Sequence, residues 1–181
     1  SSENGLYVLV STIPLELEIG WDQFRHFLDT RDIETGLASI ENHYTIVYHK
    51  QGSQWQVHAP DVLLFFEEVV NTLDTLQFDQ TYWLHSTIST TLYLTATDDI
   101  VPATPLYQPT SYGLPPMTLY GEVMPTDIIT PTEGMLVVAK AGSLICGSSP
   151  IQLWQGQLIY TLQAKDRCLG QAVSFRSEEH T

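Results

Sequence analysis

Positive charge is the property that this sequence has least of. Lys and Arg number 7 against 21 Asp and Glu, so the formal net charge is −14 at pH 7, and only 15% of the residues are charged. Nucleic acids and anionic membrane surfaces are bound through many basic side chains, so this composition argues against both partners. The polar surface must therefore consist largely of Thr, Ser, Gln and Asn, which is typical of antiparallel β proteins.

The sequence also lacks long apolar runs and catalytic motifs. No apolar run reaches the roughly 18 residues of a membrane-spanning helix. Neither a Gly-x-Ser-x-Gly motif, nor a glycine-rich phosphate loop, nor the His and Cys spacings of zinc sites occur. We therefore expect no membrane insertion, no cofactor, no metal site and no enzymatic activity.

The six histidines are the first candidates for a metal site. On one strand, His43 and His49 would lie about 20 Å apart at about 3.3 Å per residue, which is too far to share an ion. His49 and His58 would share one face of a hairpin without lying opposite each other. We therefore interpret these side chains as histidines on a solvated face.

Acidic residues offer a second kind of cation site. Oxygen ligands in loops suit Ca²⁺, but acids near turns more often cap backbone N–H groups, and capping is our interpretation here. Glu67 and Glu68 stand inside an apolar run, and we interpret them as the solvated face of a helix. The acidic pairs considered for Ca²⁺ are Asp29/Asp32 and Asp98/Asp99.

The clearest supersecondary signal lies between residues 40 and 59. Two β-rich runs flank Gly52-Ser53, a pair that suits a type II′ turn because Gly accepts a positive φ at the first central position. The turn predicts a register that pairs Lys50 with Trp55, His49 with Gln56, Tyr48 with Val57 and Val47 with His58. One face then carries Ile46, Tyr48, Trp55, Val57 and Ala59, and the other carries His49, Gln56 and His58.

Alternation and spacing predict the other elements. Residues 15–19 alternate apolar and acidic side chains, which indicates a strand with one solvated face. Residues 21–28 have apolar side chains at helical spacing and predict a short helix. Residues 62–76 fit either a helix or a buried strand, and we favour a helix over at least the second half. Further strands are predicted at 82–97, 119–123, 135–141 and 157–164.

Proline and small residues mark the connections. Residues 101–116 contain five prolines, which lack an N–H donor, so we expect a surface loop rather than a central strand. Glycine, serine and proline between 142 and 150 predict another loop. Together these features predict an all-β fold, an antiparallel β-sandwich or jelly-roll-like domain with one or two short helices. We expect one domain over residues 1–176 and a polar tail at 177–181.

Cysteine and aromatic side chains leave alternatives open. Cys146 and Cys168 could form a disulfide if their Cα atoms approach within about 7 Å, but two buried free thiols fit equally well. Trp55, Trp83 and Trp154 could serve as core, as a subunit interface or as a platform for stacking sugars, and we expect core for most. The candidate contact residues are Tyr107 and Tyr112, in the proline-rich loop.

Two segments of the last third carry a family resemblance. Residues 134–139 (GMLVVA) and 156–162 (GQLIYTL), separated by a loop of small residues, resemble the closing pair of strands in the jelly-roll coat proteins of small icosahedral RNA viruses. The sparse charge and the Pro- and Thr-rich connecting segments of this sequence are also similar to those of the same family. Shell proteins of this family often have a basic arm that meets the genome. The 181 residues contain none, and the acidic balance favours a protruding domain over a shell domain.

The resemblance implies a structural virion protein located in an extracellular particle. Its partners would be copies of itself and other capsid subunits, with a host receptor or glycan as a further partner of a protruding domain. A different class of function is a secreted or cell-surface carbohydrate-binding or adhesin β-domain. Exposed Tyr and Trp side chains beside Asn, Asp and Gln would serve that second class.

Overall fold

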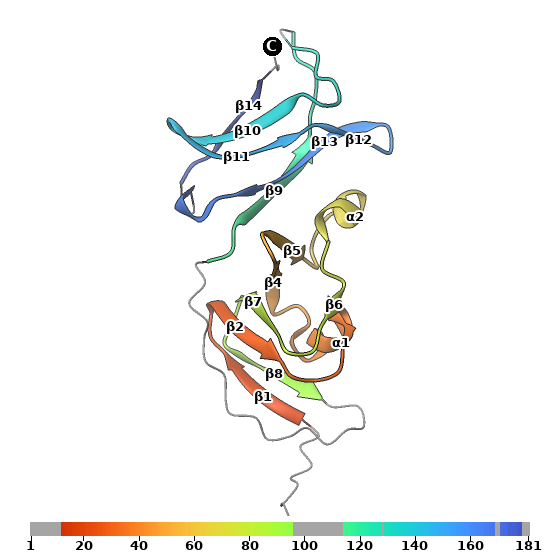
Figure 1. Cartoon of the computed structure of the whole chain (residues 1–181), viewed down its shortest axis with the longest axis vertical. Helices are drawn as coiled ribbons and strands as arrows, with labels where there is room; N and C mark the ends of the chain where they lie inside the picture. The colour runs from red at the N-terminus through yellow and green to blue at the C-terminus, as the bar shows by residue number, and fades with distance from the viewer. Residues whose placement is uncertain (1–11, 96–113, 128, 169–170, 179–181) are drawn as a thin grey trace, which may run out of the picture. The chain divides into compact units, whose positions relative to one another are not determined.

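The structure, a computed structural model, describes residues 12–95, 114–127, 129–168 and 171–178. It is all-β, as predicted, with antiparallel pairing in the described sheets and two short α-helices (Figure 1). The chain divides into two compact units. Unit 1 comprises Ser1–Val62 and Asn71–Ser111, and unit 2 comprises Leu63–Val70 and Tyr112–Thr181. The sequence predicted one domain over residues 1–176 because composition changes little between these parts.

Unit 1 is built on a four-stranded sheet with the order β2-β7-β4-β5. One face of this sheet is covered by the β1–β8 strand pair, the β3–β6 pair and two short helical turns, α1 and η1. The elements are β1 (Thr12–Leu17), β2 (Gly20–His26), β3 (Arg31–Asp32), α1 (Ile33–Leu37), η1 (Ala38–Ile40), β4 (Tyr44–Gln51), β5 (Gln54–His58), β6 (Thr75–Leu76), β7 (Gln80–Ser86) and β8 (Thr90–Thr95).

The core of unit 1 lies between the sheet and these covering elements. Successive side chains of a strand point to opposite faces, so each strand of the sheet gives alternate residues to the core. Leu15 and Leu17 of β1 do the same, which confirms the strand predicted from their alternation with acidic residues. The buried core side chains include Leu17, Phe24, Ile33, Leu37, Ile40, Val47, Tyr82, Leu84, Leu92 and Leu94.

The hairpin β4–β5 has the predicted register. Val47 lies opposite His58, Tyr48 opposite Val57, His49 opposite Gln56 and Lys50 opposite Trp55. Gly52 has a φ of +62°, as the predicted turn requires. The outer edge of β5 is closed by residues 71–73, because the N–H groups of Thr72 and Leu73 both donate to the carbonyl of Val57.

Replacing Gly52 with Val is expected to lower the free energy of unfolding by about 1–2 kcal/mol, because a β-branched residue would be forced to a positive φ. No atom lies within 4 Å of a Cβ built at Gly52, so backbone strain alone would cause the loss. Ser53→Val is the matched control, since Ser53 is exposed in the same turn and its φ is not positive. Urea unfolding of both variants measures the difference, and equal stabilities would contradict the turn assignment.

The predicted helix at residues 21–28 is wrong, because the segment forms strand β2, paired along its length with β7. Phe24, His26 and Leu28 are the buried residues, which is a period of two. The pattern was hidden because His26 was counted as polar, while Trp21 and Phe27 on the opposite side supplied apolar residues at helical spacing.

The ambiguous segment 62–76 is neither one helix nor one strand. It contains a 3₁₀ turn, η2 (Leu64–Phe66), and one turn of α-helix, α2 (Glu67–Val70), and then enters β6. A helix over its second half is therefore wrong, because the 71–73 backbone bonds to β5 instead. The predicted strand at 82–97 is interrupted after Ser86, where the chain turns from β7 into β8.

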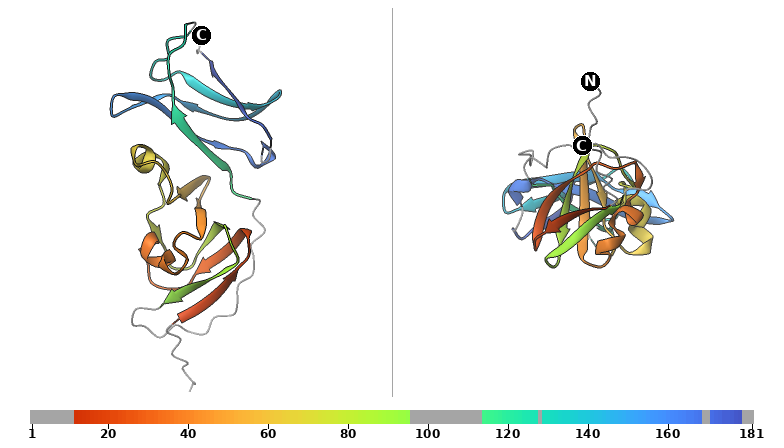
Figure 2. Two further views of the ribbon diagram at one scale, coloured as in Figure 1. Left: turned by 180° about the vertical axis from the view of Figure 1, so that it is seen from behind. Right: turned by 90° about the horizontal axis from the view of Figure 1, so that it is seen from below.

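Unit 2 contains two three-stranded sheets that face each other as two layers (Figures 1 and 2). One has the order β11-β10-β14 and the other β12-β13-β9. Their core includes Val137, Ala139, Cys146, Leu162 and Cys168. The elements are β9 (Met117–Glu122), β10 (Leu136–Ala141), β11 (Leu144–Pro150), β12 (Gln152–Trp154), β13 (Gln157–Ala164), η3 (Asp166–Cys168) and β14 (Ser174–Glu178).

The loop predicted over 142–150 is wrong except at its beginning. Gly142, with φ +60°, turns β10 into β11, and residues 144–150 are a strand that continues through Ile151 into β12 of the facing sheet. Gly147 is not a turn residue. A Cβ at this position would lie 2.7 Å from the carbonyl oxygen of Gln163 in β13, so the close approach of two strands requires glycine.

The two segments that carry the family resemblance are both strands, β10 and β13, but they do not pair with each other. β10 is the central strand of one sheet and β13 the central strand of the other. β14 extends to Glu178 and pairs with β10, so the first two residues of the predicted tail belong to a strand.

Candidate binding surface on the four-stranded sheet

Three of the four tryptophans of the chain lie on one face of the unit 1 sheet, opposite the core. Trp21 lies opposite His85, and Trp83 lies between Gln23 and Tyr48. Trp55 extends the face onto β5, opposite Lys50. We call this surface the tryptophan face; its residues are Trp21, Gln23, Arg25, Ile46, Tyr48, Lys50, Trp55, Val57, Thr81, Trp83 and His85.

Tyr48 is at the centre of the tryptophan face. Its ring centroid lies 6.0 Å from that of Trp21 and 6.1 Å from that of Trp55. Tyr48 is only 1% exposed, whereas Trp21, Trp55 and Trp83 each remain partly exposed. The tryptophans therefore form a broad aromatic surface that is partly in contact with solvent, and the expectation of core burial for Trp55 and Trp83 is only partly met.

The charge of the tryptophan face differs from that of the unit that carries it. Unit 1 has 13 acidic and 3 basic side chains, for a net charge of −10, yet none of the eleven residues that make up the tryptophan face is acidic. Arg25 forms an ion pair with Asp79 at 2.5 Å. The Lys50 ammonium lies 5.7 Å from the Trp55 ring centre, a cation–π arrangement.

The histidines of the hairpin lie on the opposite, core-facing side of the sheet. His49 and His58 are each only 6% exposed, so the prediction of a solvated histidine face is wrong. His49 Nδ1 is 3.0 Å from the carbonyl of Thr81, and His58 Nε2 is 3.4 Å from the Tyr44 hydroxyl. Burial, assisted by nearby acids, raises the pKa of Tyr44 to about 12, so this hydroxyl keeps its proton. Hydrogen-bonded imidazoles can replace aliphatic side chains in a core.

His26 is also buried, and its Nδ1 atom has no hydrogen-bond partner among the residues that the structure describes. Its Nε2 is 2.9 Å from the carbonyl oxygen of Asp29, a geometry that requires Nε2 to carry the proton. Protonation of Nδ1 would create a buried N–H without an acceptor. Burial accordingly lowers the pKa of His26 below its usual value of 6.5.

Acidification is expected to destabilise unit 1 through His26. Because its folded-state pKa lies below the unfolded value near 6.5, the unfolded chain takes up the proton first, and stability falls as the pH drops from about 6.5 toward the folded-state pKa. Thermal unfolding between pH 8 and 5 should show this loss, and His26→Gln should reduce its slope. An unchanged slope in His26→Gln would assign the pH dependence to other groups.

The acidic pairs behave as capping and pairing residues where they are described. Asp32 accepts hydrogen bonds from the N–H groups of Glu34 and Thr35 and so begins α1, which confirms the capping interpretation. Asp29 forms an ion pair with Arg31 at 2.6 Å. Among the described residues, no group of three His, Cys, Asp or Glu side chains could hold a metal ion. Asp98 and Asp99 lie outside the described residues.

Other candidates have different outcomes. Glu67 and Glu68 are exposed on α2, as predicted. Tyr107 and Tyr112, the contact residues expected from the sequence, lie outside the described residues.

Trp21 was missed as a surface residue because it was assigned to a helix. The signal that could have found it is the alternation of Trp21 and Gln23 with the buried Phe24 and His26.

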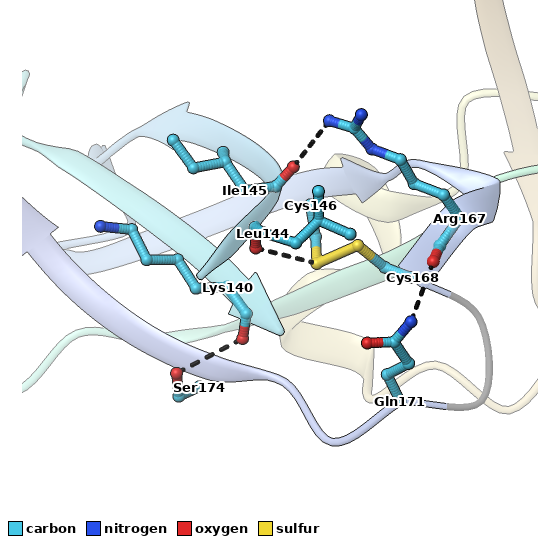
Figure 3. The surroundings of a disulfide bond; sticks show 8 residues. All are labelled: Lys140, Leu144, Ile145, Cys146, Arg167, Cys168, Gln171 and Ser174. Atoms are coloured by element: carbon cyan, nitrogen blue, oxygen red, sulfur yellow. Dashed lines mark hydrogen bonds between the residues drawn. A yellow bond between two sulfur atoms is a disulfide. The ribbon is translucent and has the colours of Figure 1, made fainter. Parts of the chain in front are cut away.

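Cys146 and Cys168 form a disulfide, which resolves the alternative left open by the sequence (Figure 3). Their Cα atoms are 5.8 Å apart, and both residues are fully buried. The bond joins β11 to η3, close to the point where the N–H of Lys165 donates to the carbonyl of Cys146. Disulfides persist mainly in oxidising, extracellular environments.

No protein family model, curated protein or solved structure matches this chain. In the described parts of the chain, no helix is long and apolar enough to cross a membrane.

Proposed function

We propose that this chain is a structural protein of a virion, in the capsid shell or a protruding spike, and that it acts by associating with copies of itself. The observation that carries the proposal is the outer face of the β11-β10-β14 sheet in unit 2. We call this surface the apolar face; it has Leu136, Val138, Ile145 and Pro150 outward, beside Lys140, Ser148 and Ser174.

The apolar face suits contact between copies for two reasons. Ile145 is 52% exposed and Pro150 is exposed, so apolar area remains to be buried. None of the seven residues of the apolar face is acidic. Two copies can therefore meet there without bringing together the many carboxylates that give the chain a net charge of −14.

The acidic balance, the sparse charge and the resemblance of residues 134–139 and 156–162 to coat proteins support a virion role. Both segments form strands, β10 and β13, and each is the central strand of its own sheet. A protruding domain is the form of the proposal that the acidic balance favours, because such a domain faces outward and does not meet the genome.

Self-association is expected to tighten as pH falls from 8 toward 5, because carboxylates take up protons and repulsion between copies decreases. The Asp22 carboxylate should be among the first to take up a proton as the pH falls, because burial and the neighbouring Glu18 raise its pKa. Added salt should act in the same direction, because the repulsion is screened over about 8 Å at physiological salt. Sedimentation at two salt concentrations measures this effect.

Ile145→Lys should abolish association, because it places a charge on the apolar face. Ile88→Lys is the matched control, since Ile88 is an exposed isoleucine between β7 and β8 of unit 1. A strictly monomeric wild-type protein at high concentration from pH 8 to 5 would contradict the proposal. So would an equal loss of association in both variants.

A second class of function is a secreted or cell-surface carbohydrate-binding β-domain. The tryptophan face of unit 1 is the specific observation that favours it. The two classes are distinguished by particle formation, which the virion proposal requires and a sugar-binding module does not.

A further inference from the structure

We propose that the turn between β2 and β3 of unit 1 is an acid-operated switch, in which protonation of His26 opens residues 27–31 and exposes Leu28. The inference concerns unit 1 alone and goes beyond the proposed self-association, which uses the apolar face of unit 2. Its basis is a fully buried imidazole at the end of β2 and, beside it, a short turn that one arginine links to the rest of the unit.

The surroundings of His26 accept only the neutral imidazole. The side chain is fully buried, its Nε2 donates to the carbonyl of Asp29, and its Nδ1 has no partner among the described residues. A second proton, on Nδ1, would create a buried charge and a buried donor without an acceptor, and both are unfavourable. The protonated ring is therefore stable only where water can reach Nδ1, which requires the turn to open.

The charges around His26 do not remove this penalty. Arg31 opposes protonation, whereas the Asp29 carboxylate favours it but is already paired with Arg31. Burial is the largest effect and lowers the pKa of His26. The charged and titratable groups of the surrounding elements are Arg25 of β2 with its partner Asp79, Asp29 of the turn, Arg31 of β3, Tyr82 of β7, whose own pKa is raised by burial, and His49 of β4 beside Tyr82.

The turn can open without disrupting the four-stranded sheet. Asp29 and Thr30 are exposed, and β3 has only two residues, paired with the equally short β6. The Arg31 guanidinium links the turn to the rest of the unit, because it donates to the Asp29 carboxylate at 2.6 Å and to the carbonyl of Thr95, the last residue of β8, at 2.7 Å. Segments held by so few contacts are those that open locally in a folded protein.

Proton binding therefore favours the open turn. In the open form the imidazole is in water and has its usual pKa of 6.5, whereas in the closed form its pKa is lower. As pH falls below about 6.5, the open form takes up the proton first, and the closed turn loses stability until the closed-state pKa is reached. Between these two values, the ratio of open to closed turns rises by up to about tenfold per pH unit. Leu28, only 3% exposed in the closed turn, then becomes accessible.

Native-state hydrogen exchange of the full chain, followed by NMR at pH 7.5 and 5.5 in low concentrations of urea, tests the switch. The reporters are the amides of Ile33 and Asp79, which donate to the carbonyls of Asp74 and His26. Corrected for the intrinsic effect of pH on exchange, their opening constants should rise by up to about tenfold at pH 5.5 and should depend little on urea. Amides of β4 and β7 should keep the strong urea dependence of global unfolding.

Three variants identify the group that responds to pH. His26→Gln keeps an N–H donor for the Asp29 carbonyl but cannot be protonated, so it should remove the pH dependence of both reporters. His85→Gln is the matched control, since His85 is partly exposed on β7, where its Nδ1 lies 3.1 Å from the Thr45 hydroxyl, and it should change nothing. Arg31→Gln should increase opening already at pH 7.5, because the guanidinium link is lost.

The proposal is overturned if, at pH 5.5, the two reporters open with the same free energy and urea dependence as β4 and β7, since His26 would then be released only by global unfolding. It is also overturned if His26→Gln keeps the pH dependence, if His85→Gln removes it, or if Arg31→Gln leaves opening unchanged. The His26 ring resonances of the wild type give a check that needs no variant. Titration of this ring at or above pH 6.5 would show that the closed turn accepts the proton, which contradicts the switch.

Discussion

Removing the Cys146–Cys168 disulfide is expected to lower the free energy of unfolding of unit 2 by about 3 kcal/mol. The two cysteines are 22 residues apart, and a cross-link of this span restricts the unfolded chain by roughly that amount. Both side chains are also fully buried in the core between the two sheets, so neither can be solvated without opening this core. Cys146→Ala/Cys168→Ala is the variant of choice, since it removes the bond without leaving free thiols.

Hydrogen exchange followed residue by residue measures this effect with an internal control. Amides of β10 and β13 in unit 2 should exchange faster in the double variant, whereas amides of β4 and β7 in unit 1 should be unchanged. The reduced wild-type protein should behave in the same way as the variant. An unchanged exchange rate in β10 and β13 would show that the sheets of unit 2 hold together without the cross-link.

Tyr82→Ala is expected to destabilise unit 1 by roughly 3–5 kcal/mol, as for other large aromatic residues removed from a core. Tyr82 is fully buried and stacks on Phe24 at 5.4 Å, with the His49 ring 4.9 Å away. Its hydroxyl accepts a hydrogen bond of 2.6 Å from the N–H of Gln77, at the turn that leads into β7. The side chain therefore joins three strands of the sheet to a turn.

Tyr82→Phe separates the packing contribution from the hydrogen bond. The ring contacts remain, but the N–H of Gln77 loses its acceptor, so a smaller loss of about 1–3 kcal/mol is expected. Urea denaturation of the two variants gives both values. Equal losses would mean that the ring packing at Phe24 and His49 contributes little, which would contradict the core described for unit 1.

Local chemistry was sufficient to predict one hairpin completely. Gly52-Ser53 defines a two-residue turn, and a turn of known length sets the register of both strands that it joins. The strands β1, β9, β10 and β13 were likewise predicted within a few residues, because each has an uninterrupted β-rich or alternating pattern. The all-β class followed from these runs and from the low charge.

The candidate surface could be predicted only in part. The hairpin register predicted the correct division of its residues between two faces, but not which face is the core. Both faces carry residues that can be buried, since His49 and His58 form hydrogen bonds on one side and Tyr48 packs beneath tryptophans on the other. Which face becomes the core is decided by α1 and the β1–β8 pair, which cover one face of the sheet and are distant in sequence from the hairpin.

By itself, the sequence determined the all-β class, the acidic surface and the β4–β5 register, because each depends on composition or on residues within a few positions of one another. Tertiary structure decided the rest. Strand β2 exists because it pairs with β7, about 60 residues later, and Gly147 lies in a strand because β13 approaches it closely. The disulfide formed because η3 brings Cys168 within 5.8 Å of Cys146. These contacts join segments distant along the chain, and local residue patterns carry no information about such distances.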